Sequence, residues 1–145
     1  MLTLLRNVLA IVLGVVIGSL LNMALVMLGP MLIPPPAGVD MTTTEGLATA
    51  MPLLGPQHFL FPFLAHALGT LGGALVAFFI AASHKTRFAY AVGLVFLSGG
   101  IAACFMIPAP AWFMVLDLLL AYLPMAWLGV FIASHSGTGL PPARE

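Results

Sequence analysis

Charged side chains are scarce in this sequence. Lysine and arginine number four, aspartate and glutamate number four, and charged residues make up 6% of the 145-residue chain. A soluble domain normally carries about 25% charged residues, which keep its surface in contact with water. The scarcity excludes an ordinary soluble fold, and it predicts a protein whose main partner is the lipid bilayer.

Two further absences narrow the classes of function. The formal net charge is zero, so the chain lacks the excess of cations that neutralises phosphates, and we expect no nucleic-acid partner. Cys104 is the single cysteine, which excludes an intrachain disulfide or a CxxC motif. No G-x-S-x-G, HExxH, P-loop or GxGxxG pattern occurs either. An enzyme is therefore the least favoured class.

Metal and haem sites are poorly supported as well. His58 and His66 fall on one predicted helix, about 12 Å apart along its axis, which is too far for both to bind one ion. Met23, Met27 and Met31 form a helical stripe of the soft thioethers that suit Cu(I), but flexible core filling is the commoner use of methionine. We expect no cofactor and no metal.

Long apolar runs are what the sequence has in abundance, since 62% of its residues are hydrophobic. A helix needs about 20 apolar residues to cross about 30 Å of hydrocarbon. The runs that qualify are 8–28, 59–83, 88–106 and 112–134. They predict an all-α fold, an antiparallel four-helix transmembrane bundle. We expect one membrane domain over residues 1–136 and a flexible cytoplasmic tail at 137–145.

The positive charges predict how the bundle is oriented. Arg6 precedes the first run, Lys85 and Arg87 separate the second from the third, and Arg144 follows the fourth. An even number of spans places all of them on one side, which the positive-inside rule identifies as the cytoplasm. Both termini are therefore expected to be cytoplasmic.

The one long polar connection, residues 29–57, is expected on the outer face. Thr42 and Glu45 have the spacing of a capping box. This predicts a short interfacial helix that ends at Pro52.

Small residues form stripes along the predicted spans. Helices in lipid associate through close packing, which small residues allow. The glycines expected to pack between helices are Gly14, Gly18, Gly69, Gly73, Gly93 and Gly100. The face with Gly14 and Gly18 could also join copies of the chain in a homo-oligomer, or join it to a larger assembly.

A candidate polar cluster lies in the outer half of the bundle. Asn22, His66 and Asp117 are each on the order of 10 Å inside the hydrocarbon, counted from the outer helix ends at 1.5 Å per residue. An unpaired ionisable group there costs about 2.5–3.5 kcal/mol, so we expect Asp117 to pair with His66 and Asn22 to lie beside them. His58 and Glu45 are expected above them at the interface, Glu45 more as a helix cap than as a ligand.

Several runs resemble an uncharacterised family of small bacterial four-span integral membrane proteins. They are 34–40 (PPPAGVD), 61–70 (FPFLAHALGT), 98–102 (SGGIA), 108–113 (PAPAWF) and 121–129 (AYLPMAWLG). The resemblance extends from Gly18 to Gly129. It implies a bacterial inner-membrane location and four spans, and it carries over no catalytic or binding residues.

Two interpretations of the polar cluster stay open. In the first, it only holds helices together, and the protein is a structural or accessory membrane component. In the second, it is a proton relay or ligand site in an oligomeric transporter or channel for protons, ions or a small solute.

Overall fold

The chain folds into a bundle of helices, described here by a computed structural model for residues 1–38 and 40–136. All regular elements within these residues are helical. Four segments are long and apolar enough to cross a membrane, and they are Leu2–Leu32, Pro56–Ile80, Lys85–Met106 and Ala111–Ser136. The predicted all-α four-helix bundle is confirmed, and the chain is a multi-pass membrane protein.

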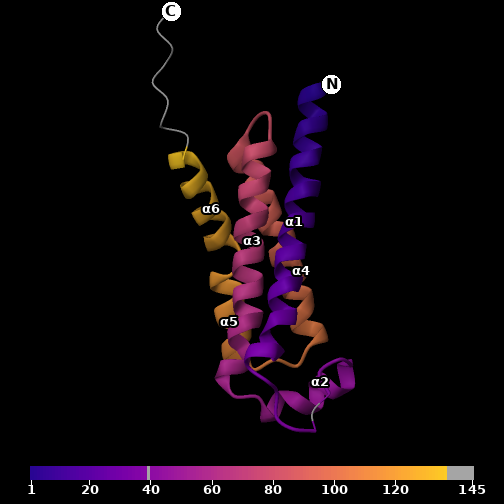
Figure 1. Cartoon of the computed structure of the whole chain (residues 1–145). Coiled ribbons are helices and arrows are strands. Elements are labelled where there is room, and N and C mark those ends of the chain that lie inside the picture. Colours follow the sequence, from indigo (N-terminus) through magenta and orange to yellow (C-terminus); the bar gives the residue numbers. More distant parts are fainter. Residues whose placement is uncertain (39, 137–145) are drawn as a thin grey trace, which may run out of the picture.

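Figure 1 shows the order of the elements along the bundle. They are α1 (Leu2–Leu32), α2 (Thr44–Ala50), the 3-10 turns Met51–Leu53 and Pro56–Phe59, α3 (Leu60–Ile80), α4 (Lys85–Met106), α5 (Ala111–Leu120) and α6 (Leu123–Ser136). The start of α1, the α3–α4 turn and the end of α6 lie together at what we call the terminal end (Figure 1). The opposite end carries α2 and is called the α2 end. The tail at 137–145 lies outside the described residues.

The first helix is longer at both ends than the apolar run from which it was predicted. It begins at Leu2 and continues past Pro30 to Leu32. Proline removes only one hydrogen bond this close to the end of a helix. The N–H of Ile33 still donates a hydrogen bond to the carbonyl oxygen of Gly29 at 2.8 Å.

Four glycines bring α1 and α3 into backbone contact. A methyl group at Gly14 would lie 2.7 Å from the carbonyl oxygen of Gly73, and one at Gly18 would lie 2.5 Å from that of Gly69. The reverse approaches, from Gly73 and Gly69, are 2.7 and 2.9 Å. We call this contact the glycine notch. It occupies the Gly14 and Gly18 face within the chain, so this face is not the free surface that oligomerisation through it would need.

The start of α1 caps the end of α3 at the terminal end. Asn7 Oδ1 accepts hydrogen bonds from the N–H groups of Ala82 and Ser83 at 2.9 and 3.3 Å, and its Nδ2 donates to Ser83 Oγ at 2.9 Å. Arg6 donates from Nε and Nη2 to the carbonyl of Ile80. A cation at the C-terminal end of a helix also favours its dipole. Arg6 and Asn7, which precede the first apolar run, thus join the start of α1 to the end of α3 by hydrogen bonds.

The fourth span is two helices, although the run 112–134 was predicted as one. α5 ends at Leu120 and α6 begins at Leu123. Pro124 has no N–H for the carbonyl four residues before it, which interrupts the helical ladder. The intervening Ala121 and Tyr122 are 0% and 1% exposed, so the break faces the interior of the bundle.

The helix in the long connection is capped one residue later than predicted. Thr43 is its N-cap and accepts from the N–H of Gly46 at 3.0 Å, so the capping box expected at Thr42 and Glu45 is wrong. Thr42 instead donates its hydroxyl and its N–H to Asp40 Oδ1, at 2.6 and 2.8 Å. These hydrogen bonds, the hydroxyl first, lower the pKa of Asp40 from its ordinary value.

Candidate functional site

A carboxylate and an imidazole meet deep in the bundle. His66 on α3 places Nδ1 2.9 Å from both Oδ1 and Oδ2 of Asp117 on α5. Asp117 is 4% exposed, whereas the His66 side chain is 26% exposed. The carboxylate is thus enclosed by protein, and the imidazole connects it to open space.

Tyr122 completes this pair from the break between α5 and α6. Its hydroxyl donates to Asp117 Oδ2 at 2.7 Å, and its ring stacks on His66 with centroids 5.8 Å apart. The α4 backbone fits against the tyrosine because position 100 is glycine, where any Cβ would collide with the Tyr122 hydroxyl. Tyr122 was not predicted as part of the cluster. A tyrosine in the middle of a predicted span was the available signal, since a buried hydroxyl requires a partner.

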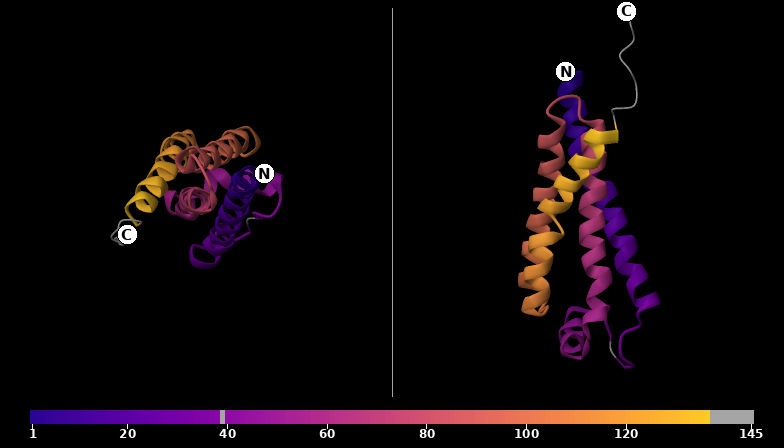
Figure 2. Two further views of the ribbon diagram at one scale, coloured as in Figure 1. Left: turned by 90° about the horizontal axis from the view of Figure 1, so that it is seen from above. Right: turned by 90° about the vertical axis from the view of Figure 1, so that its left-hand side faces the viewer.

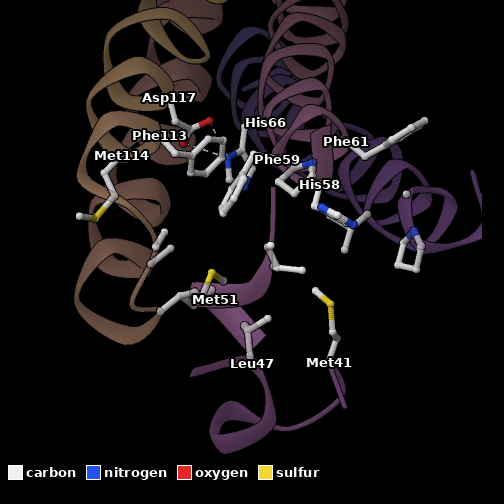
Figure 3. Close-up of a pocket in the computed structure, with 18 of the residues that line it drawn as sticks. Met41, Leu47, Met51, His58, Phe59, Phe61, His66, Phe113, Met114 and Asp117 are labelled. Carbon is white, nitrogen blue, oxygen red and sulfur yellow. Dashed lines mark hydrogen bonds and ion pairs between the residues drawn. The ribbon is translucent and has the colours of Figure 1, made fainter. Parts of the chain in front are cut away.

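A main cavity of about 320 Å³ opens beside this pair toward the α2 end (Figure 3). Asp117 and His66 lie at its inner end, while Leu47 and Met51 reach toward it from the α2 connection. Its walls come from α1, α3, α4 and α5 and are mostly apolar; among the residues that line them are Val26, Phe61, Cys104, Phe113 and Met114. The size falls within the range of small-molecule sites.

A second cavity of about 390 Å³, the side cavity, lies between α1 and α4. Ser19 and Asn22 line it from α1, and it shares His66, Gly100 and Ala103 with the main cavity. The two spaces therefore adjoin at the imidazole.

The structure brings together part of the predicted cluster. Asn22 lines the side cavity with His66, but its carboxamide makes no hydrogen bond within the described residues. Glu45 lies exposed on α2 and lines neither cavity, so the structure does not place it with the others.

His58 lies at the edge of the main cavity, in the turn that leads into α3. Its Nδ1 is 3.1 Å from the carbonyl oxygen of Gly55, and its Nε2 is 3.2 Å from that of Pro34. A neutral imidazole can donate to only one of these carbonyls, and a protonated imidazole to both. His58 thus ties the end of α1 to the start of α3.

The cavities are closed toward the terminal end. Beyond the side cavity, Val92 packs into the glycine notch, its methyl groups 3.0 Å from the Cβ positions of Gly14 and Gly73. Val92 itself is 0% exposed. The open space therefore ends near the middle of the bundle.

No cluster of three or more histidine, cysteine, aspartate or glutamate residues suited to a metal occurs within the described residues. The methionine stripe of Met23, Met27 and Met31 is exposed and directed outward. Cys104 lies on the wall of the main cavity and is partly exposed.

No protein-family model, curated protein or solved structure matches the chain.

Proposed function

We propose that the protein is a small accessory component of the bacterial inner membrane that binds a lipophilic molecule in the main cavity. The observation that carries the proposal is the buried Asp117–His66 pair at the inner end of an apolar cavity. If the pair served only to join α3 to α5, open space beside it would be unfavourable, because packed interiors leave few voids. A cavity with apolar walls and a few convergent polar groups is the usual form of a small-molecule site.

A binding site also fits the closed inner end of the cavities better than a through-going path does. A transporter or channel needs polar or hydrated space on both sides of the membrane. Here Val92 packs into the glycine notch against Gly14 and Gly73, on the terminal side of the side cavity. The alternative of an oligomeric transporter would have to build its path between copies of the chain.

The location and orientation belong to the same proposal. The one-sided positions of Arg6, Lys85 and Arg87 support a cytoplasmic terminal end by the positive-inside rule. The α2 end and the main cavity then face the outside. The resemblance to bacterial four-span proteins supports the inner membrane.

The single cysteine supplies the test. Cys104 lies in the cavity wall, so a bound molecule should shield it from N-ethylmaleimide. The protein would be reconstituted in synthetic phosphatidylcholine alone and in the same lipid with added bacterial inner-membrane lipid extract. Intact-mass spectrometry then gives the alkylation rate. We expect the extract to slow alkylation of Cys104 several-fold.

A matched control uses the neighbouring position. Phe105 is 86% exposed and directed to lipid, so Phe105→Cys in a Cys104→Ala background reports any general effect of the extract. Its alkylation rate should not change. Equal rates for Cys104 with and without extract would contradict the binding proposal. A proton leak in the same liposomes, abolished by Asp117→Asn, would favour the transporter instead.

A further inference from the structure

We propose that the ligand is an uncharged amphiphile with a hydroxyl head group, and that it enters from the bilayer through the side cavity. This inference rests on the proposed binding function. It adds the chemistry of the ligand and its route to the site.

His66 is the group that the ligand meets. A carboxylate only accepts hydrogen bonds, so the Nδ1 that faces Asp117 carries a hydrogen. Tyr122 also donates to this carboxylate, which is enclosed. The other ring nitrogen, His66 Nε2, makes no hydrogen bond within the described residues. A hydroxyl both donates and accepts, so it can bond to Nε2 whether or not that nitrogen carries a hydrogen.

The charges around the cavities exclude an anionic head group. Among the residues that the structure describes, no lysine or arginine lines either cavity, as Arg6, Lys85 and Arg87 all lie at the terminal end. The nearest charge is the carboxylate of Asp117. A phosphate or carboxylate head would therefore lose its water without gaining a cation, which is strongly unfavourable in an apolar site.

Asn22 provides a second polar contact for the same head group. It lies against α3, where its Cβ is 3.0 Å from the Cβ position of Gly69, and it lines the side cavity together with His66. A carboxamide without a partner at this depth is costly, and a hydroxyl beside it would satisfy it. The head group is thereby assigned to the space between Asn22 and His66.

The side cavity gives the route from the bilayer. Met23 and Val95 at its rim are exposed, so its mouth faces hydrocarbon once the bundle is in a membrane. The residues that it shares with the main cavity, besides His66, are Gly100 and Ala103. Gly100 is packed against Tyr122, but Ala103 is small and leaves room for an apolar chain to pass into the main cavity while the head group stays at the junction.

The test compares two probes that differ only in the donor. 4-Nonylphenol has a hydroxyl, and 4-nonylanisole has a methyl ether in its place. Each is titrated against the alkylation of Cys104 by N-ethylmaleimide. We expect the phenol to protect at about five-fold lower concentration than the ether, the factor expected for one hydrogen bond. Farnesyl phosphate, with an anionic head, should protect least.

Four variants locate the contact and the route. The paired change His66→Leu with Asp117→Asn removes the acceptor without leaving a lone carboxylate, and it should abolish the preference for the phenol. Asn22→Leu should reduce the preference, and Glu45→Gln, at a position that lines neither cavity, should leave it unchanged. Ala103→Phe fills the passage between the cavities and should remove protection by both probes. Each variant is compared with its own rate without a probe.

The outcomes separate this inference from the binding function. If phenol and ether protect equally, or if farnesyl phosphate protects best, the hydroxyl assignment is overturned while binding in the cavity stands. Protection by the lipid extract but by neither probe also overturns the hydroxyl assignment. Full protection in Ala103→Phe would overturn the route alone. If neither the extract nor any probe protects Cys104, the binding function fails with the inference.

Discussion

His66 Nδ1 lies 2.9 Å from both carboxylate oxygens of Asp117, and this contact joins α3 to α5. Interhelical hydrogen bonds in membrane bundles contribute about 0.6 kcal/mol on average, and charge-assisted bonds are roughly twice as strong. We therefore expect Asp117→Asn and His66→Gln each to lower the free energy of unfolding by about 1–2 kcal/mol. Reversible unfolding in mixed detergent micelles would measure it.

The double substitution tests whether the two residues act together. Because each single change leaves a partner without its bond, the double variant should lose clearly less than the sum of the two single losses. Strict additivity would show that the two groups contribute independently.

Tyr122 and Gly100 give a second coupled pair. Gly100→Ala places a methyl group against the Tyr122 hydroxyl, with Cζ 2.5 Å away, and should push the ring off Asp117. Overpacking of this kind costs about 1–3 kcal/mol. Tyr122→Phe removes the hydroxyl and should partly restore stability in the Gly100→Ala background. Thermal denaturation in detergent would measure the loss of stability in Gly100→Ala and its partial recovery in the double variant. Gly99→Ala is the control, since its Cβ position faces open space, with no neighbouring side chain or other helix within 4 Å.

The glycine notch predicts an intolerance to methyl groups between α1 and α3. Gly18→Ala would set a methyl group 2.5 Å from the carbonyl oxygen of Gly69, so the helices must separate. We expect the midpoint of thermal unfolding to fall by several degrees, again with Gly99→Ala unaffected. If Gly18→Ala is as stable as the unsubstituted protein, the helices do not meet at these glycines.

Asn7 should slow amide hydrogen exchange in the turn between α3 and α4. Asn7→Leu removes the acceptor for the N–H groups of Ala82 and Ser83 and should speed amide hydrogen exchange at both. Asn7→Asp keeps the acceptor oxygen, so the amides of Ala82 and Ser83 should exchange as slowly in this variant as in the unsubstituted protein. Fast exchange in Asn7→Asp would indicate that the carboxamide acts through Nδ2 instead.

The proposed orientation is open to direct labelling. Cysteines at Thr43 and Thr86 in a Cys104→Ser background lie at opposite ends of the bundle. An impermeant maleimide added to intact cells should reach position 43 only. Labelling at position 86 instead would reverse the orientation.

The sequence predicted the features that depend on one helix at a time. The four apolar spans follow from run length, and the depth of His66 and Asp117 follows from counting along their helices. The break at Tyr122 was missed because a proline inside an apolar run can either kink a span or be accommodated in it. The two cavities could not be predicted, since they depend on how α1, α3 and α4 are placed relative to one another (Figure 2).

Capping was also hard to predict, for a physical reason. Thr42 and Thr43 have the same side chain, but Thr42 donates to Asp40 whereas Thr43 caps α2. Asn7 showed no signal as a cap because its partners Ala82 and Ser83 are distant in the sequence. Such choices are made by tertiary contacts rather than by local pattern.

The glycine notch also bears on the order in which the protein is made. Gly14 and Gly18 leave the ribosome well before Gly69 and Gly73, and the whole α2 connection is translated between them. α1 is long and apolar enough to span the bilayer by itself before α3 is made. Until α3 is inserted, Asn7 and the glycine face of α1 have no partner from the chain itself. Pairing of α1 with α3 through the glycine notch therefore has to wait until α3 has been made and inserted.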